Sequence, residues 1–421
     1  MDEERLDILS RIVNNQIDVI LGKKAYAIQK ENKQIMGIES SGRRGEYMVI
    51  KGEFAEAAVF TEQIEEYAVA QIRQLCDQKA FSGCRIAVMP DVHPGKVGPI
   101  GFTSTLGDAV LPAVVGIDIG CGMTMARLKK AGKVDFTRLD KVIREGVPSG
   151  SGNRRRPHRF AEAFDFSRLR CVSHINVRRA MEGLGTLGGG NHFIEVDRDA
   201  DGGLCLVVHS GSRHLGKEVA EHYLKQGQKV LKEAGRDAVY ELTWLEGSLM
   251  EDYLADVSVV QKYAEQNRLA MIDEILKGMK WKAEDVVSCV HNYVDFTGEE
   301  PILRKGAISA RKGEPVIIPI NMKDGVLVGE GLGNADWNYS APHGAGRIGS
   351  RESVRESHTV AQFKKEMEGV YSSCIGAGTL DEAPFAYRRI ADILPLLTDA
   401  VKVTDILQPV YNYKGQKEGK E

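Results

Sequence analysis

The chain has 421 residues, of which 43% are hydrophobic and 27% charged, and its formal net charge is −3 at pH 7. This balance disfavours a protein that binds nucleic acid through overall basicity, so any anion site must be local. The seven cysteines form no CxxC pair, and no run of about 18 apolar residues occurs. A disulfide scaffold and a membrane-spanning helix are therefore excluded, and a cytoplasmic location is expected.

Helices and strands are predicted to mix along the chain without a strict βαβ rhythm. Residues 1–46 are expected to form an N-terminal extension of unknown role, with an amphipathic helix near residues 8–13, and residues 47–421 one catalytic domain. Thr61 is expected to cap a helix with Ile64, Ala68, Ile72 and Leu75 on its apolar face. The other predicted strands are 85–89, 204–208, 286–294 and 315–320, and the other predicted helices are 216–234, 256–278, 353–368 and 384–399. This mixture predicts an α+β fold.

The glycines are concentrated in three segments. Of the 45 glycines, 23 lie in residues 95–123, 183–216 and 325–349. Because glycine permits positive φ and a close approach of the backbone to a ligand, such clustering indicates shaped loops. Each segment also carries side chains of the metal-binding or nucleophilic kind.

The first glycine-rich segment carries a carboxylate and a thiolate three residues apart. An apolar run ends in Asp118-Ile119-Gly120-Cys121-Gly122, which would project both groups from one tight turn. Together they are able to share a metal ion. The alternative is a turn aspartate beside a buried cysteine.

Further candidate ligands follow along the chain. His192 comes after three glycines, and His209 stands at the end of a predicted strand. Cys289 and His291 share one face of another predicted strand, so either is a candidate ligand. A single histidine is more often a structural residue, but two beside glycine loops favour a functional site.

The last glycine-rich segment combines a histidine with arginines. His343 lies in a Pro/Gly turn, and Arg347, Arg351 and Arg355 are expected on one helical face. Arginines in this arrangement bind phosphates, although a solvated basic face is the usual alternative. The attachment to the Pro-His-Gly turn favours a phosphate-handling site.

Two segments resemble nucleotide-binding motifs but lack the features that these motifs require. Residues 183–188 match GxGxxG, but the stretch before them is helix-like, whereas a dinucleotide fingerprint follows a strand. Lys323-Asp324-Gly325 lacks the spacer of the Lys-x-Asp-Gly motif of lysine-dependent nucleotidyl transferases. A lysine-adenylating ligase is therefore disfavoured.

Taken together, six segments resemble the RNA-splicing ligase RtcB family. In chain order they are PDVH (90–93), DIGCGM (118–123), GGGNHFIE (188–195), HSGSR (209–213), HNY (291–293) and HGAGR (343–347). The resemblance runs from about residue 47 to the C-terminus. It implies mixed β-sheets flanked by helices around a central two-metal cleft.

The resemblance implies two Mn²⁺ ions and GTP as cofactors. Asp118, Cys121 and His192 match the ligands of one ion. Cys121, His209 and His291 match the ligands of the other, with Cys121 bridging. Ligand chemistry alone would favour Zn²⁺, because thiolate is a soft ligand, so the assignment to Mn²⁺ rests on the resemblance.

The resemblance also implies roles around the nucleotide. His343 matches the histidine that becomes covalently guanylylated, and Asp91 matches an acid that assists attack by the RNA 5′-hydroxyl. Residues that match the holders of GMP are Asn191, Glu195 and Lys414. Residues expected to face RNA phosphates are Arg213, Arg347 and Arg351.

The implied activity is GTP-dependent ligation of RNA 3′-phosphate or 2′,3′-cyclic phosphate ends to 5′-hydroxyl ends, in RNA repair or tRNA splicing. The expected partners are broken tRNA or rRNA; the need for an activating protein and the choice between a monomer and a dimer both stay open.

The sequence departs from the family at residues 319–324, which replace the Pro-Gly-Ser-Met-Gly loop of other members. This departure motivates two alternatives, a metal-dependent RNA-end phosphohydrolase without nucleotidyl transfer and a non-enzymatic RNA-binding or ribosome-associated factor. The intact segment 342–347 favours the ligase.

Overall fold

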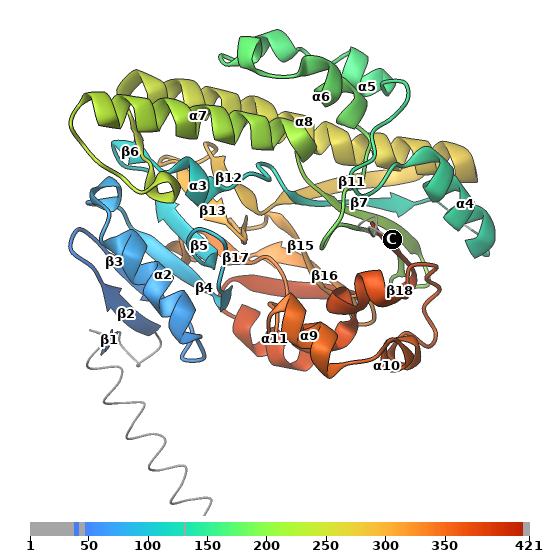
Figure 1. Cartoon of the computed structure of the whole chain (residues 1–421). Helices are drawn as coiled ribbons and strands as arrows, with labels where there is room; N and C mark the ends of the chain where they lie inside the picture. The colour runs from blue at the N-terminus through green and yellow to red at the C-terminus, as the bar shows by residue number, and fades with distance from the viewer. Residues whose placement is uncertain (1–37, 42–46, 130–131, 416–421) are drawn as a thin grey trace, which may run out of the picture.

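The computed structural model describes residues 38–41, 47–129 and 132–415, and two seven-stranded sheets lie at its centre (Figure 1). Helices α7 and α8 run side by side over both sheets, and shorter helices lie on the opposite side of the molecule (Figure 1). This arrangement confirms the predicted α+β fold. The helix predicted near residues 8–13 lies outside the described residues.

The first sheet is mostly antiparallel, and only its β3–β4 pair is parallel among the described strands. Its order is β1 (Ile38–Ser41), β2 (Tyr47–Lys51), β3 (Glu56–Val59), β4 (Ile86–His93), β5 (Ile100–Thr105), β13 (Ile302–Lys305) and β12 (Asn292–Asp295). Strand β1 pairs with β2, while the division of the chain at residue 46 stays a prediction.

The second sheet is antiparallel throughout its described pairs, and its strands carry the candidate residues Glu195, His209 and Lys414. Its order is β11 (Ala283–Val290), β7 (Gly122–Leu128), β9 (Leu204–Ser210), β8 (Phe193–Arg198), β18 (Val401–Lys414), β16 (Gly325–Gly331) and β15 (Pro315–Asn321). Two small ribbons complete the strands, β6 (Ala109–Val110) with β10 (Leu245–Glu246) and β14 (Ala307–Ser309) with β17 (Ser340–Pro342).

The helices range from single turns to the long α8. They are α2 (Glu66–Cys76), α3 (Pro112–Val115), α4 (Phe136–Gly146), α5 (Arg159–Glu162), α6 (Val177–Gly183), α7 (Arg213–Glu233), α8 (Gly247–Met279), α9 (Arg351–Ser357), α10 (Val360–Glu366) and α11 (Ile390–Leu397). None of these described helices is both long and apolar enough to cross a membrane.

Alternation along β9 decides which side chains face the space between the two sheets. Leu206 and Val208 pack in a core with Met271 of α8, on the outer face of the second sheet. Val207 instead belongs to the core between the sheets. His209 is two residues beyond Val207 on the same strand, so its side chain lies on the same face and points toward the space between the sheets.

The predicted strand 286–294 is wrong as one element, because the chain changes sheets at His291. Strand β11 ends at Val290 in the second sheet, and β12 begins at Asn292 in the first. The carbonyl of His291 accepts hydrogen bonds from the backbone of Gly306 and Ala307, and its N–H donates to the carbonyl of Cys121. His291 is thereby fixed between the two sheets.

Three predicted helix boundaries are also wrong. Helix α2 begins at Glu66, and the Thr61 hydroxyl accepts from the N–H of Gln63 in the preceding loop. The predicted helix 353–368 is two helices, because Thr359 caps a new helix and accepts from the N–H of Gln362. Within the predicted helix 384–399, a 3₁₀ turn precedes α11, which begins at Ile390.

Candidate metal and nucleotide site

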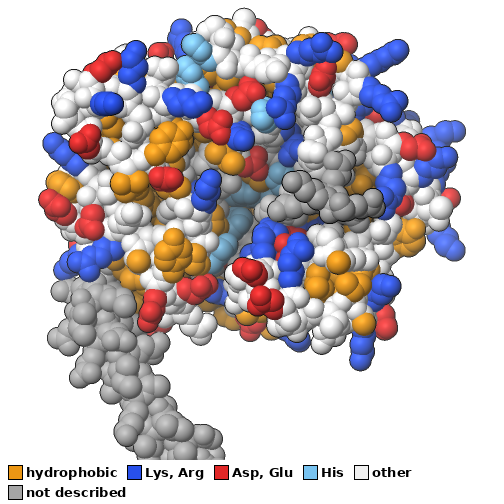
Figure 2. All heavy atoms as spheres, viewed as in Figure 1, with side chains coloured by type: hydrophobic (Ala, Val, Ile, Leu, Met, Phe, Trp, Pro, Cys, Tyr) orange, Lys and Arg blue, Asp and Glu red, His pale blue; other side chains and the backbone are white. Residues whose placement is uncertain are grey.

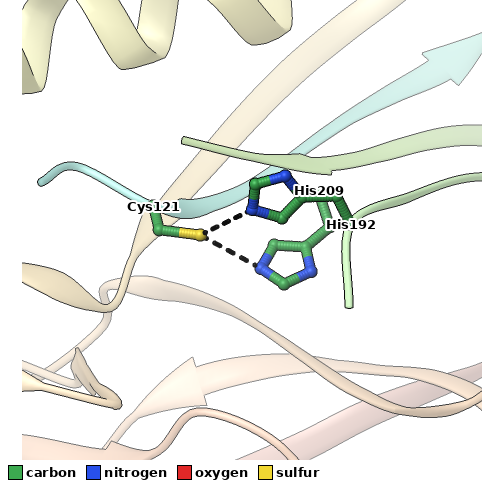
Figure 3. Close-up of side chains that lie close together, drawn as sticks. All are labelled: Cys121, His192 and His209. Atoms are coloured by element: carbon green, nitrogen blue, oxygen red, sulfur yellow. Dashed lines mark hydrogen bonds between the residues drawn. The ribbon is translucent and has the colours of Figure 1, made fainter. Parts of the chain in front are cut away.

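The five predicted metal ligands converge between the sheets. The Sγ atom of Cys121 lies 3.5 Å from His192 Nε2 and 3.4 Å from His209 Nε2 (Figure 3). His291 Nε2 lies 3.3 Å from His209 Nε2, and Asp118 Oδ2 lies 3.1 Å from His192 Nε2. The chain therefore brings one thiol, one carboxylate and three imidazoles to one point.

Two of the histidines are oriented by backbone carbonyls. His192 Nδ1 lies 2.8 Å from the carbonyl oxygen of Leu187, and His209 Nδ1 lies 3.2 Å from that of Asn191. Each Nδ1 donates its proton in these contacts, which leaves the Nε2 lone pair directed at Cys121. Such a backbone partner behind the imidazole is typical of metal-binding histidines.

Glycine is required at two positions beside this cluster. A Cβ atom at Gly211 would lie 2.1 Å from Asp118 Oδ1, inside the space of the carboxylate. Gly188 has a φ of +85°, and a Cβ there would lie 2.0 Å from the guanidinium of Arg213. Part of the glycine excess therefore makes room for Asp118 and for the loop that carries His192.

The electrostatics of the cluster suit a bound cation. Burial opposes ionisation of Asp118, but the neighbouring His192 and Arg213 side chains outweigh burial and lower the pKa of Asp118 to about 2. Burial lowers the pKa of His209 and His291 well below the usual range, so both imidazoles are neutral, the form that binds metals. Burial and the Asp118 carboxylate raise the pKa of Cys121 well above its usual range, so a thiolate here needs a cation.

Arg268 holds the backbone behind the cluster. This side chain of α8 is fully buried, and its Nη1 donates to the carbonyls of Gly120 at 2.8 Å and Ser210 at 3.0 Å. Its Nε donates to Thr124 Oγ1 at 2.8 Å. Arg268 thus joins the start of β7, next to Cys121, to the end of β9.

Replacing Arg268 with methionine is expected to lower the free energy of unfolding by about 3 kcal/mol, because it removes a donor from the buried carbonyls of Gly120 and Ser210 and from the hydroxyl of Thr124. Urea unfolding measures this change. Arg178→Met, at an exposed position on α6, serves as the control and should change the value by less than about 0.5 kcal/mol. Equal effects of the two substitutions would contradict this role of Arg268.

His343 stands at the edge of a cavity of about 220 Å³ that also reaches His209 and His291. Figure 2 shows histidine side chains deep in a hollow of this face, with Lys and Arg side chains beside it. His343 Nδ1 lies 2.9 Å from Asp91 Oδ2, which also accepts the backbone N–H of His343. The ring centroids of His343 and His291 are 5.0 Å apart. Asp91 thus orients His343 beside the cluster. The predicted role of Asp91 toward a 5′-hydroxyl stays a prediction.

Strands β8 and β18 form a polar wall of the cavity. Their register pairs Glu195 with Asn412 and Phe193 with Lys414, and all four residues line the cavity. Lys414 Nζ lies 5.5 Å from the Phe193 ring centroid and 2.9 Å from Glu382 Oε2. Asn191 lines the cavity as well, so the three predicted GMP-holding residues share one wall region.

Glu195 belongs to a pair of buried carboxyl groups. Burial raises the pKa of Glu195 to about 7, against the opposing influence of Asp197, Asn412 and Lys414. Burial and the neighbouring Glu195 charge raise the pKa of Asp197 well above its usual range. Asp197 is therefore the protonated member, which keeps neutral a buried carboxyl group whose two oxygens have no hydrogen-bond partner among the described residues.

The three predicted RNA-facing arginines are tied to protein groups. Arg347 lies outside α9, so the predicted common helical face with Arg351 is wrong. Arg347 Nη2 donates to the carbonyl of Asp381 at 2.6 Å, and Arg351 Nη1 lies 2.6 Å from Asp381 Oδ2. Arg213 does not line the cavity and bonds Thr186 and the carbonyl of Gly150 instead. Their role toward RNA stays a prediction.

Some cavity residues have no counterpart among the sequence candidates. Glu382 and Tyr387 reach the cavity from segments with no glycine-rich motif. Asn412 could have been found from its position two residues before Lys414, because such residues share a strand face.

Cys289, the alternative to His291, lies apart from the cluster and bonds the carbonyl of Pro315 at 3.3 Å. The divergent loop contributes Pro319, Ile320, Asn321 and Met322 to the cavity.

Comparison with known proteins identifies the family of the chain. The family model described as tRNA-splicing ligase RtcB matches residues 71–165 and 161–415. RNA-splicing ligase RtcB of Escherichia coli strain K12 is 31% identical over 411 residues, which cover 88% of this chain and 100% of that protein. tRNA-splicing ligase RtcB of Archaeoglobus fulgidus is 27% identical over 437 residues, which cover 82% of this chain and 91% of that protein. The chain belongs to the tRNA-splicing ligase RtcB family.

Proposed function

We propose that this protein is a GTP- and Mn²⁺-dependent RNA ligase that joins 3′-phosphate or 2′,3′-cyclic phosphate ends to 5′-hydroxyl ends through a covalent guanylate on His343. The observation that carries the proposal is the position of His343, whose Nδ1 contacts Asp91 at 2.9 Å while its ring lines the cavity beside His291. The names of the relatives support the RNA ligase activity. Broken tRNA or rRNA is the proposed substrate.

His343 acts as the nucleophile in the first step. With its Nδ1 proton held by Asp91, the Nε2 lone pair attacks the α-phosphorus of GTP; a P–N bond forms and the P–O bond to pyrophosphate breaks. Asp91 stabilises the positive charge that develops on the imidazole.

The guanylate then passes to RNA. An oxygen of the RNA 3′-phosphate attacks the guanylate phosphorus, the P–N bond breaks, and His343 returns to its neutral form. The 5′-hydroxyl of the second strand next attacks the 3′-phosphorus and gives up its proton to Asp91, and GMP leaves, which forms the phosphodiester. A 2′,3′-cyclic phosphate is hydrolysed to the 3′-phosphate beforehand.

The residues of the cluster fit the two implied ions. Asp118, Cys121 and His192 would hold one Mn²⁺, and Cys121, His209 and His291 the other. When bound, the ions supply neutralisation of phosphate charge and polarisation of phosphoryl oxygens. The neutral state of His209 and His291 is what leaves their lone pairs available.

The wall formed by β8 and β18 holds the GMP moiety. Glu195 presents a carboxylate, Lys414 an ammonium group and Asn191 an amide to the cavity. Glu382 balances the charge of Lys414 at 2.9 Å. Burial opposes ionisation of Glu382, but Lys414 and Arg351 outweigh it and lower its pKa to about 2.

Affinity for GMP is expected to fall about tenfold from about pH 8 to about pH 6, because burial raises the pKa of Glu195 to about 7 and the guanine edge requires its ionised form. Titration calorimetry at several pH values measures this dependence. Glu195→Gln is the control. This variant should bind GMP more weakly than wild type, and its affinity should vary with pH only through titration of the GMP phosphate. Equal pH dependence in wild type and Glu195→Gln would contradict the role of Glu195.

The proposal is tested by sealing of defined RNA ends under single-turnover conditions. The full chain in excess, with Mn²⁺ and GTP, should convert a labelled 3′-phosphate strand and a 5′-hydroxyl strand into one longer strand. Omission of GTP should prevent sealing. Opening of a cyclic phosphate without GTP and with no sealed product would instead show the phosphohydrolase that the divergent 319–324 loop suggests. RNA binding with no chemistry would show a binding factor.

A further inference from the structure

Asn412 Oδ1 is among the buried polar atoms of the cavity wall that have no hydrogen-bond partner in the described part of the chain. Asn412 is 1% exposed and lines the cavity together with His343. Its Nδ2 donates a hydrogen bond to Glu195 Oε2. Its Oδ1 is buried and accepts no hydrogen bond from any described residue. Because buried acceptors almost always have a donor, this oxygen indicates a donor supplied by a ligand.

The strand register places this oxygen among the other polar groups of the wall. Antiparallel pairing sets Asn412 opposite Glu195, and Lys414 lies opposite Phe193 two residues further along the same face. The hydrogen bond to Glu195 fixes the Asn412 amide with its nitrogen toward the carboxylate. Its oxygen then stands as an acceptor beside the acceptors of Glu195, with the donor Lys414 nearby.

This combination of two acceptors and a donor discriminates between purines. The Watson–Crick edge of guanine offers the donors N1–H and N2–H₂ next to the acceptor O6. Adenine offers one amino group next to the acceptor N1, which would face the Glu195 carboxylate. Two adjacent acceptors with a donor nearby therefore match guanine, and hypoxanthine matches except for the missing 2-amino group.

The geometry points to Asn412 as the residue that reads the 2-amino group of guanine, through a hydrogen bond from that group to Asn412 Oδ1. The inference rests on the proposed function, since it takes GMP as the moiety that occupies the cavity. Glu195 accepts N1–H and the other N2 hydrogen, and Lys414 donates to O6. Asn412 is thus a specificity-determining residue that separates guanine from hypoxanthine.

The test compares equilibrium binding of GMP and IMP, which differ only in the 2-amino group. Titration calorimetry on the full chain with Mn²⁺ should show that wild type prefers GMP. Asn412→Leu should reduce the ratio of GMP to IMP affinity about tenfold, the effect of one hydrogen bond. Loss of this contact alone leaves the affinity for IMP unchanged, whereas an indirect effect through Glu195 also weakens IMP, whose N1–H still faces that carboxylate. Asn412→Ala is the second variant, and measurable IMP binding shows that each variant is folded.

Tyr413→Phe is the matched control. Tyr413 is the next residue of β18, but its side chain belongs to the core on the opposite face of the sheet. This variant should keep the wild-type ratio. An unchanged ratio in Asn412→Leu, or a wild type that binds IMP or XMP as tightly as GMP, would overturn the inference.

The same measurements separate this inference from the ligase proposal. GMP preference that depends on Asn412 supports the inference even if no sealed RNA forms, in which case the proposed function alone fails. Sealing with GTP, together with an Asn412→Leu variant whose ratio is unchanged, overturns the inference and leaves the ligase proposal intact.

Discussion

His343→Ala is expected to abolish formation of the protein–GMP adduct, with a loss of about 10⁴-fold or more in its rate. The physical reason is that the substitution removes the nitrogen that bonds to phosphorus, and no other side chain of the cavity has the same relation to Asp91. Incubation with labelled GTP and Mn²⁺, followed by denaturing electrophoresis, measures the adduct. An acid-labile, alkali-stable bond is expected in wild type, as a phosphoramidate requires.

His358→Ala is the matched control for this experiment. His358 stacks on Phe385 with ring centroids 4.0 Å apart and lies outside the set of residues that line the cavity. The variant should form the adduct at the wild-type rate. An adduct that persists in His343→Ala would show that another residue is the nucleophile.

The second large effect is expected for Cys121→Ala, which should weaken Mn²⁺ binding by at least about 100-fold and remove sealing activity. Cys121 Sγ is the atom that lies within 3.5 Å of both His192 and His209, so its loss affects both proposed ions. Metal titration followed by electron paramagnetic resonance gives the number of bound ions and their affinity. Wild type should bind two per chain.

Cys84→Ala provides the comparison for that titration. Cys84 is partly exposed and lies in the loop before β4, away from the cluster. Its substitution should leave both Mn²⁺ ions and the sealing rate unchanged. Two tightly bound ions in Cys121→Ala would contradict the proposed bridging position.

The cluster could be predicted because its members stand in short motifs. Asp118 and Cys121 share one turn, and His192 and His209 stand beside glycine loops at strand ends. Local sequence is informative there, since the backbone needs glycine to make room for the carboxylate of Asp118. The structure brings these residues together, while their roles toward metal and nucleotide stay proposals.

Other features depend on pairing between distant segments and could not be predicted from local pattern. Asn412 meets Glu195 only because β18 pairs with β8. His291 occupies its position because the chain crosses from one sheet to the other, whereas an apolar run such as 286–294 is typical of one strand. The sequence predicts that the arginines near His343 are open to phosphates. In the structure they form ion pairs with Asp381 and Glu382, and the sequence spacing of these residues gives no indication of such pairs.

The most direct test of the central claim is transfer of label from the isolated protein–GMP adduct to RNA. Wild-type adduct, separated from free GTP, is mixed with a 3′-phosphate strand and a 5′-hydroxyl strand in the presence of Mn²⁺. The account predicts that the label leaves His343, appears on the RNA 3′ end, and is released as GMP while a sealed strand forms in equal amount. Sealing that proceeds while the label stays on the protein would contradict it.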